Sequence, residues 1–101
     1  EGFVIEQLMH ILKAEPEECF FWATHAGAEL DLLVVRGSER KGFEIKRTTT
    51  PKVTPSMHSA LRDLRLSSLD VVHAGEHTFR LHQRIRAVSV NRLLVDIEPL
   101  N

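Results

Sequence analysis

The sequence of 101 residues has one cysteine, no tyrosine and no long apolar run. The lone Cys19 excludes an intrachain disulfide, so a reducing, cytoplasmic setting is the natural expectation. No stretch approaches the roughly 20 apolar residues of a membrane-crossing helix, so we expect no membrane contact. The chain lacks an initial methionine and opens on an amphipathic segment without a secretory signal. This start suggests a fragment of a longer protein or a processed terminus.

The charge is nearly balanced, with 13 Lys and Arg against 14 Asp and Glu, which gives a formal net charge of -1. A strongly basic nucleic-acid binder is therefore excluded, and any such binding must depend on a local patch. A content of 43% hydrophobic and 27% charged residues is typical of a globular protein. Residues 1–101 are expected to form a single domain.

Hydrophobic periodicity predicts an α/β fold with a mixed central sheet flanked by helices. The amphipathic segment 2–14 is expected to be a helix, and Thr54 followed by Pro55 marks the start of a second one. A short helix is expected over 91–97. The expected strands are 19–24, 28–35, 41–48, 69–74, 78–82 and 85–90.

Side chains alternate along a strand, so Leu30, Leu32 and Val34 should share one face of strand 28–35. Phe20 and Phe21 in the first strand are apolar and aromatic, and we expect them in the core.

A turn at Gly37 and Ser38 sets the expected pairing of two strands. A two-residue type II′ turn there places Arg36 opposite Glu39. Counting back puts Asp31 opposite Glu44, and Glu29 opposite Lys46. Two facing carboxylates repel each other unless a cation lies between them. Mg²⁺ or Mn²⁺ would remove the repulsion, because hard cations prefer oxygen ligands.

The residues at this pairing suggest a metal site. Asp31 and Glu44 would hold the metal, and the backbone carbonyl of Ile45 could add a ligand. Lys46 shares the face of Glu44 and would orient a water or stabilise charge on a phosphate. Glu29 would interact with Lys46 without binding the metal itself. Alternatively, the carboxylates are solvated at a sheet edge, and Lys46 forms an ordinary ion pair with Glu29.

Basic residues around the second helix provide a candidate nucleic-acid contact. Arg47 and Lys52 precede that helix, and Arg62 and Arg65 fall on one side of it. This face could contact phosphates, or it could be an ordinary solvated helix face. The histidines lack a recognised ligand spacing, and we treat His73 as a non-ligand.

The string Gly-Ala-Glu-Leu-Asp at 27–31, with Phe-Glu-Ile-Lys at 43–46, resembles the split signature of PD-(D/E)XK nucleases. Leu30-Asp31 stands where that signature has Pro-Asp. Phe-Phe-Trp at 20–22 and the start at Glu1 make the chain similar to the DUF4143 domain, over nearly its whole length. That domain occurs at the C-terminus of P-loop ATPases of the AAA+ type.

The resemblance implies a restriction-endonuclease-like core of order αβββαβ and a Mg²⁺-dependent hydrolase acting on DNA. It implies that Asp31 and Glu44 bind metal and that Lys46 assists catalysis, with Glu1 completing the site. It also implies that the ATPase domain of a parent chain is a partner. The alternative is a nuclease fold without catalysis, which serves as a nucleic-acid- or protein-binding appendage of an ATPase.

Overall fold

The computed structural model describes residues 2–101 and contains one mixed sheet of six strands. The strands lie in the order β1-β2-β3-β4-β6-β5, and β3, β4 and β6 run parallel to one another. The elements, in chain order, are α1 (Gly2–Leu12), the 3₁₀ turn η1 (Pro16–Glu18), β1 (Cys19–Ala23), β2 (Glu29–Arg36), β3 (Glu39–Ile45), α2 (Pro55–Asp63), β4 (Ser68–His73), β5 (Phe79–His82), β6 (Ile85–Ser89), the 3₁₀ turn η2 (Val90–Arg92) and α3 (Leu93–Asp96).

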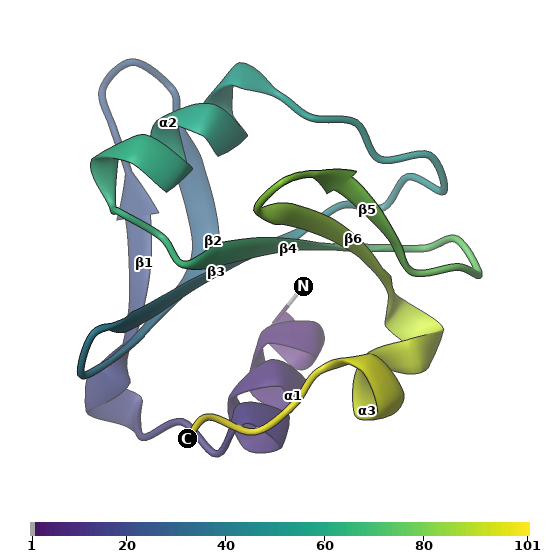
Figure 1. The fold of residues 1–101 in the computed structure, drawn as a ribbon, viewed down its shortest axis with the longest axis horizontal. Coiled ribbons are helices and arrows are strands. Elements are labelled where there is room, and N and C mark those ends of the chain that lie inside the picture. Colours follow the sequence, from purple (N-terminus) through teal and green to yellow (C-terminus); the bar gives the residue numbers. More distant parts are fainter. Residues whose placement is uncertain (1) are drawn as a thin grey trace.

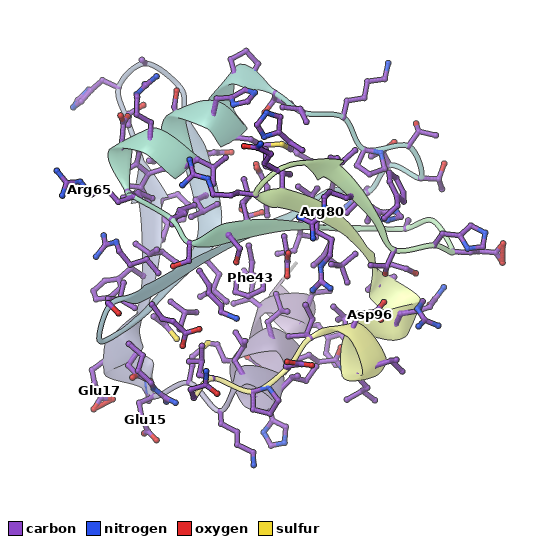
Figure 2. The ribbon with its side chains drawn as sticks, viewed as in Figure 1. Glu15, Glu17, Phe43, Arg65, Arg80 and Asp96 are labelled. Carbon is purple, nitrogen blue, oxygen red and sulfur yellow. The ribbon has the colours of Figure 1, made fainter. Side chains whose placement is uncertain are left out.

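Helices cover both faces of the sheet (Figure 1). On one face, α1 and α3 pack over a cluster that includes Leu8, Phe43 and Leu93, and Phe43 points from β3 toward α1 (Figure 2). On the other face, α2 packs over a cluster that includes Met57 and Leu69. The prediction of a mixed α/β sheet flanked by helices is therefore confirmed. Burying both faces of the sheet is the main apolar contribution to stability.

The β2–β3 hairpin has the register that the turn predicted. Gly37 has a φ of 57°, whereas the φ of Ser38 is not positive. This combination fits a type II′ turn. Arg36 pairs with Glu39, and the ladder continues in step to Leu32 opposite Phe43. The turn therefore aligns the two strands that carry the candidate metal ligands.

Strand β2 has a bulge, because it contains one residue more than β1 between two successive pairs of the ladder. Phe20 pairs with Leu33 but Trp22 pairs with Leu30, so two steps along β1 match three along β2. This bulge turns Leu30 to the α2 face beside Leu33, while Leu32 remains on the α1 face. The prediction that Leu30 shares a face with Leu32 was wrong, because simple alternation assumes an unbroken ladder.

Strand β1 is an edge of the sheet and is only partly covered. Phe20 is 49% exposed and Phe21 is 66% exposed, so the prediction that both lie in the core was wrong. An edge strand has a neighbouring strand on one side only, so its side chains have fewer residues to pack against. Several element ends also differ from expectation. Helix α1 stops at Leu12 rather than 14, and β3 runs from Glu39 to Ile45 rather than over 41–48. The helix expected over 91–97 is the 3₁₀ turn η2 followed by the short α3.

Within residues 2–101, no helix is long and apolar enough to cross a membrane.

Candidate metal centre

Glu44 and Lys46 lie where β3 ends, on the face of the sheet that α2 covers. Glu44 follows Gly42 on this face, where Leu66 and Leu69 pack, and its own side chain is buried at 7% exposure. The Nζ atom of Lys46 is 3.4 Å from Oε1 of Glu44, and the lysine side chain is 42% exposed. The strand alternation therefore brings these two groups together, as the sequence predicted.

Asp31 approaches the same point from β2. Its Oδ2 atom accepts a hydrogen bond from the backbone N–H of Ile45 at 2.8 Å. The regular pairing of β2 with β3 ends one residue earlier, at Leu32 opposite Phe43. Within a strand, a residue's N–H and C=O point to the same side. The carbonyl of Ile45 therefore faces toward β2, where Asp31 lies.

Burial makes a charge on Glu44 costly. Desolvation raises the pKa of its carboxyl, and the negative charges of Asp31 and Glu29 raise it further, while Lys46 opposes them. Oε2 of Glu44 is buried without a hydrogen-bond partner in the described part of the chain. A buried carboxylate oxygen without a partner is unfavourable, and one known explanation is an ion that binds there.

The other predicted site residues are placed as follows. Glu29 begins β2 and is anchored to α2, because its N–H donates to Oγ of Ser56 at 3.1 Å and the Ser56 hydroxyl donates back to its carbonyl at 3.3 Å. Across residues 2–101, Lys46 forms its ion pair with Glu44 and none with Glu29. Glu1 lies outside the described residues.

The ligand set within the described residues is small. No group of three or more His, Cys, Asp or Glu side chains in residues 2–101 is placed to hold a metal ion. The two carboxylates and the Ile45 carbonyl are what the structure offers. Mg²⁺ is often bound through only one or two carboxylates, with water and substrate phosphate completing its shell.

The basic residues fall into two separate groups. Arg47 and Lys52 are exposed in the segment between β3 and α2, which follows the site directly. Arg62 lies in the last turn of α2, whereas Arg65 follows the end of that helix at Asp63 and points outward (Figure 2). The prediction that both arginines lie along one side of the helix was wrong, because the helix ends at Asp63 and Arg65 has a φ of 52°. There the carbonyl of Leu64 accepts from Nε of Arg40, at the start of β3. Four residues of strand, about 13 Å, separate that point from Glu44.

The side chains of Ser56 and His73 make structural hydrogen bonds that the sequence did not predict. Ser56 connects α2 to β2, but its partner is 27 residues away, so no local pattern could reveal it. His73 is 2% exposed, its Nδ1 accepts from the N–H of Gly75, and its Nε2 lies 2.9 Å from the carbonyl of His77. Both ring nitrogens are occupied, so His73 has none left to bind a metal.

Most of the chain matches one known protein family. Residues 1–93 match the family described as Domain of unknown function (DUF4143). The chain belongs to this family. The match includes β2, β3 and α2, and so all the residues of the candidate centre.

Two relatives are close in sequence. They are uncharacterized proteins of Mycobacterium tuberculosis and Mycobacterium bovis, each 47% identical over 94 residues. The alignment covers 93% of this chain but 21% of each relative, so the chain spans about a fifth of their length. No solved structure matches the chain.

Proposed function

We propose that this domain is a Mg²⁺-dependent nuclease module that hydrolyses phosphodiester bonds of DNA, built on a PD-(D/E)XK core. The observation that carries the proposal is the buried Oε2 atom of Glu44, which has no partner in the described residues and lies beside Asp31. A divalent cation held by both carboxylates would satisfy that oxygen and offset their repulsion.

The donor set fits a hard cation. Asp31 uses Oδ2 to accept from the N–H of Ile45, and its Oδ1 is a further oxygen donor. Oε2 of Glu44 has no hydrogen-bond partner within residues 2–101. The Ile45 carbonyl faces toward β2, where Asp31 lies. All three are oxygen donors, as Mg²⁺ and Mn²⁺ prefer. When bound, the metal would polarise a phosphodiester oxygen and lower the pKa of a water.

Lys46 would provide the positive charge beside this centre. Its side chain is 42% exposed, and its ammonium lies 3.4 Å from Oε1 of Glu44. It can therefore contact a phosphate that approaches from solvent while remaining close to the carboxylate. In this position it would stabilise charge that develops on the phosphate or orient the attacking water. Glu29, which raises the pKa of Glu44, adds negative charge nearby that would retain a cation.

The fold supports the same assignment. The order α1-β1-β2-β3-α2-β4 corresponds to the αβββαβ core, and the candidate ligands lie on its second and third strands. Because the chain spans about a fifth of its relatives, a larger protein would contain further domains. We propose that an ATPase domain is among them and that Arg47 and Lys52, exposed next to the site, contact DNA.

Cleavage of DNA tests the proposal. The chain should cleave single- or double-stranded DNA in Mg²⁺ or Mn²⁺ and lose this activity in EDTA. Glu44→Gln and Asp31→Asn should each reduce the rate by at least about a hundredfold, because each removes a charged ligand. Glu17→Gln, which removes a charge on η1, is the matched control. If the Glu44→Gln variant and the Asp31→Asn variant each cleave DNA as fast as the unmodified chain, the assignment is refuted.

One observation favours a second candidate function. Glu44 already pairs with Lys46, and Asp31 already accepts from Ile45, so part of the site is occupied by the protein itself. Such a site suits a nuclease fold that binds a partner without catalysis. Calorimetric titration with Mn²⁺ separates the two functions: a site that needs Asp31 and Glu44 should bind the ion, whereas a purely structural module should not.

A further inference from the structure

A second group of charged residues lines a cavity of about 290 Å³ at the other end of the sheet. Lys41, Arg80, Arg84 and Arg86 contribute four positive charges, and Asp70 contributes one negative charge. The lining therefore has a formal charge of +3, although the whole chain has a net charge of -1. Positive charge is thus concentrated here, and the rest of the chain has a formal charge of -4.

The strand register forces like charges together in this group. Arg86 on β6 is directly opposite Asp70 on β4 on one side and Arg80 on β5 on the other. The guanidinium of Arg86 bonds to the Asp70 carboxylate at 3.1 Å and 3.4 Å, so that single acid is already engaged. Opposed like charges on neighbouring strands are destabilising, and within residues 2–101 the Asp70 carboxylate pairs with Arg86 but not with Arg80.

Two of the arginines are held in place with most of their donors unused. Nη1 of Arg80 donates to the carbonyl of Gln83 at 2.9 Å, and Nη1 of Arg84 donates to that of Leu66 at 3.1 Å. Among residues 2–101, neither arginine has a carboxylate within 4.0 Å. A guanidinium has five N–H donors in a fixed plane. Tethered guanidiniums with unused donors are pre-organised for a ligand with several oxygens.

This cavity is separate from the candidate metal centre. Asp70 pairs with Phe43, whose side chain packs on the α1 face, whereas Glu44 projects to the α2 face. The cavity lies near the N-terminal ends of β4 and β6, and Glu44 lies near the C-terminal end of the parallel strand β3. A ligand here therefore does not depend on the proposed nuclease activity.

We propose that this cavity binds a phosphate group through Arg80 and Arg84, with Lys41 and Arg86 adding positive charge. Phosphate suits the site better than a single carboxylate, because it has more oxygens and can carry a second negative charge against a lining of +3. Ser67, which has a hydroxyl group that can donate a hydrogen bond, also lines the cavity. The phosphate could belong to a small free molecule or to the end of a nucleic-acid strand.

NMR titration of the chain distinguishes these sources. The probes are sodium pyrophosphate and a single-stranded oligonucleotide with or without a 5′-phosphate, all at constant ionic strength. We expect saturable shifts of the Nε–Hε signals of Arg80 and Arg84. Saturation by pyrophosphate identifies a free phosphate as a ligand, and a response only to the phosphorylated oligonucleotide identifies a strand end. Either outcome supports the phosphate site.

The variants Arg80→Gln and Arg84→Gln should each weaken binding about tenfold or more, because each removes a charge-assisted donor. Lys13→Gln removes one positive charge from an exposed residue outside the cavity lining and should leave pyrophosphate binding unchanged. Arg80 and Arg84 are both exposed, so both variants should fold. The absence of saturable shifts, or equal weakening of pyrophosphate binding by Lys13→Gln, would overturn the proposal.

Discussion

The carboxylate of Asp31 accepts a hydrogen bond from the backbone N–H of Ile45, with 2.8 Å between Oδ2 and N. The regular pairs of β2 with β3 end just before this contact, at Leu32 opposite Phe43. The side chain of Asp31 thus takes over an amide that an unbroken ladder would give to a carbonyl of β2. Asp31 therefore has a structural role in addition to its proposed role as a metal ligand.

Substitutions at Asp31 should separate the two roles. Asparagine keeps a side-chain oxygen for the N–H of Ile45 but loses the charge, so Asp31→Asn should keep its stability and lose Mn²⁺ binding. Asp31→Ala leaves that N–H without its partner and should lower the free energy of unfolding by about 1–3 kcal/mol. Urea denaturation and calorimetry measure these quantities. Equal stability of the two variants would show that the hydrogen bond contributes nothing.

Glu44 should make stability depend on pH in the absence of divalent ions. Burial raises the pKa of its carboxyl in the folded state, so the folded protein holds this proton more tightly than the unfolded chain. The stabilisation is fully present below the unfolded pKa of about 4.5 and is lost as pH rises through the raised folded value. Glu44→Gln stays neutral and should avoid this loss.

Urea denaturation in EDTA, at about pH 4 and about pH 7, checks this prediction. The variant Glu44→Gln should be more stable than the unmodified chain at the higher pH, and the two should converge at the lower pH. If the difference between them stays constant with pH, burial of Glu44 does not disfavour its charged form.

Glu18 should produce the opposite dependence on pH. Both of its carboxylate oxygens accept from Arg36, Oε2 at 2.8 Å and Oε1 at 2.9 Å, and this contact lowers the pKa of Glu18 to about 2. Arg36 also donates to the carbonyl of Lys13, so the pair ties η1 and the end of α1 to β2. The stabilisation is present above about pH 4.5 and is lost as pH falls toward about 2.

The variant Glu18→Gln should therefore melt at a lower temperature than the unmodified chain at neutral pH, and the difference should vanish near pH 2. Glu17→Gln changes the neighbouring exposed acid and serves as the control for general charge effects. The effect should shrink at high salt, because the pair is partly exposed. A difference in melting temperature that persists near pH 2 would contradict this account.

Local signals were sufficient to predict the hairpin and the start of α2. Gly37 and Ser38 specify a turn whose geometry fixes the register for five consecutive pairs, from Arg36 opposite Glu39 onward. Thr54 accepts from the N–H of Met57 and caps α2, as a threonine before Pro55 indicates. In both places the deciding interactions lie within a few residues along the chain. The shared face of Glu44 and Lys46 also follows from alternation alone.

The bulge in β2 and the exposure of β1 could not be read from the sequence in the same way. The extra residue between Leu30 and Leu33 is defined only against β1, and no glycine marks it. Phe20 and Phe21 look like core residues, and only the strand order shows that β1 is an edge. The hydrogen bond between Asp31 and Ile45 joins residues 14 positions apart, so it too required the structure.

Gly42 should tolerate no larger side chain, which tests the packing below α2. A Cβ atom there would lie 2.7 Å from Cδ1 of Leu66, 3.0 Å from Cδ2 of Leu30 and 3.2 Å from Cδ1 of Leu69. All three leucines are buried, so Gly42→Ala should lower the free energy of unfolding by about 1–3 kcal/mol through overpacking. Gly2→Ala is the control, since among residues 2–101, apart from its chain neighbour and the backbone of its own helix, no atom lies within 4 Å of its Cβ position. Urea denaturation measures both, and a Gly42→Ala variant as stable as the unmodified chain would mean that these leucines can move aside without cost.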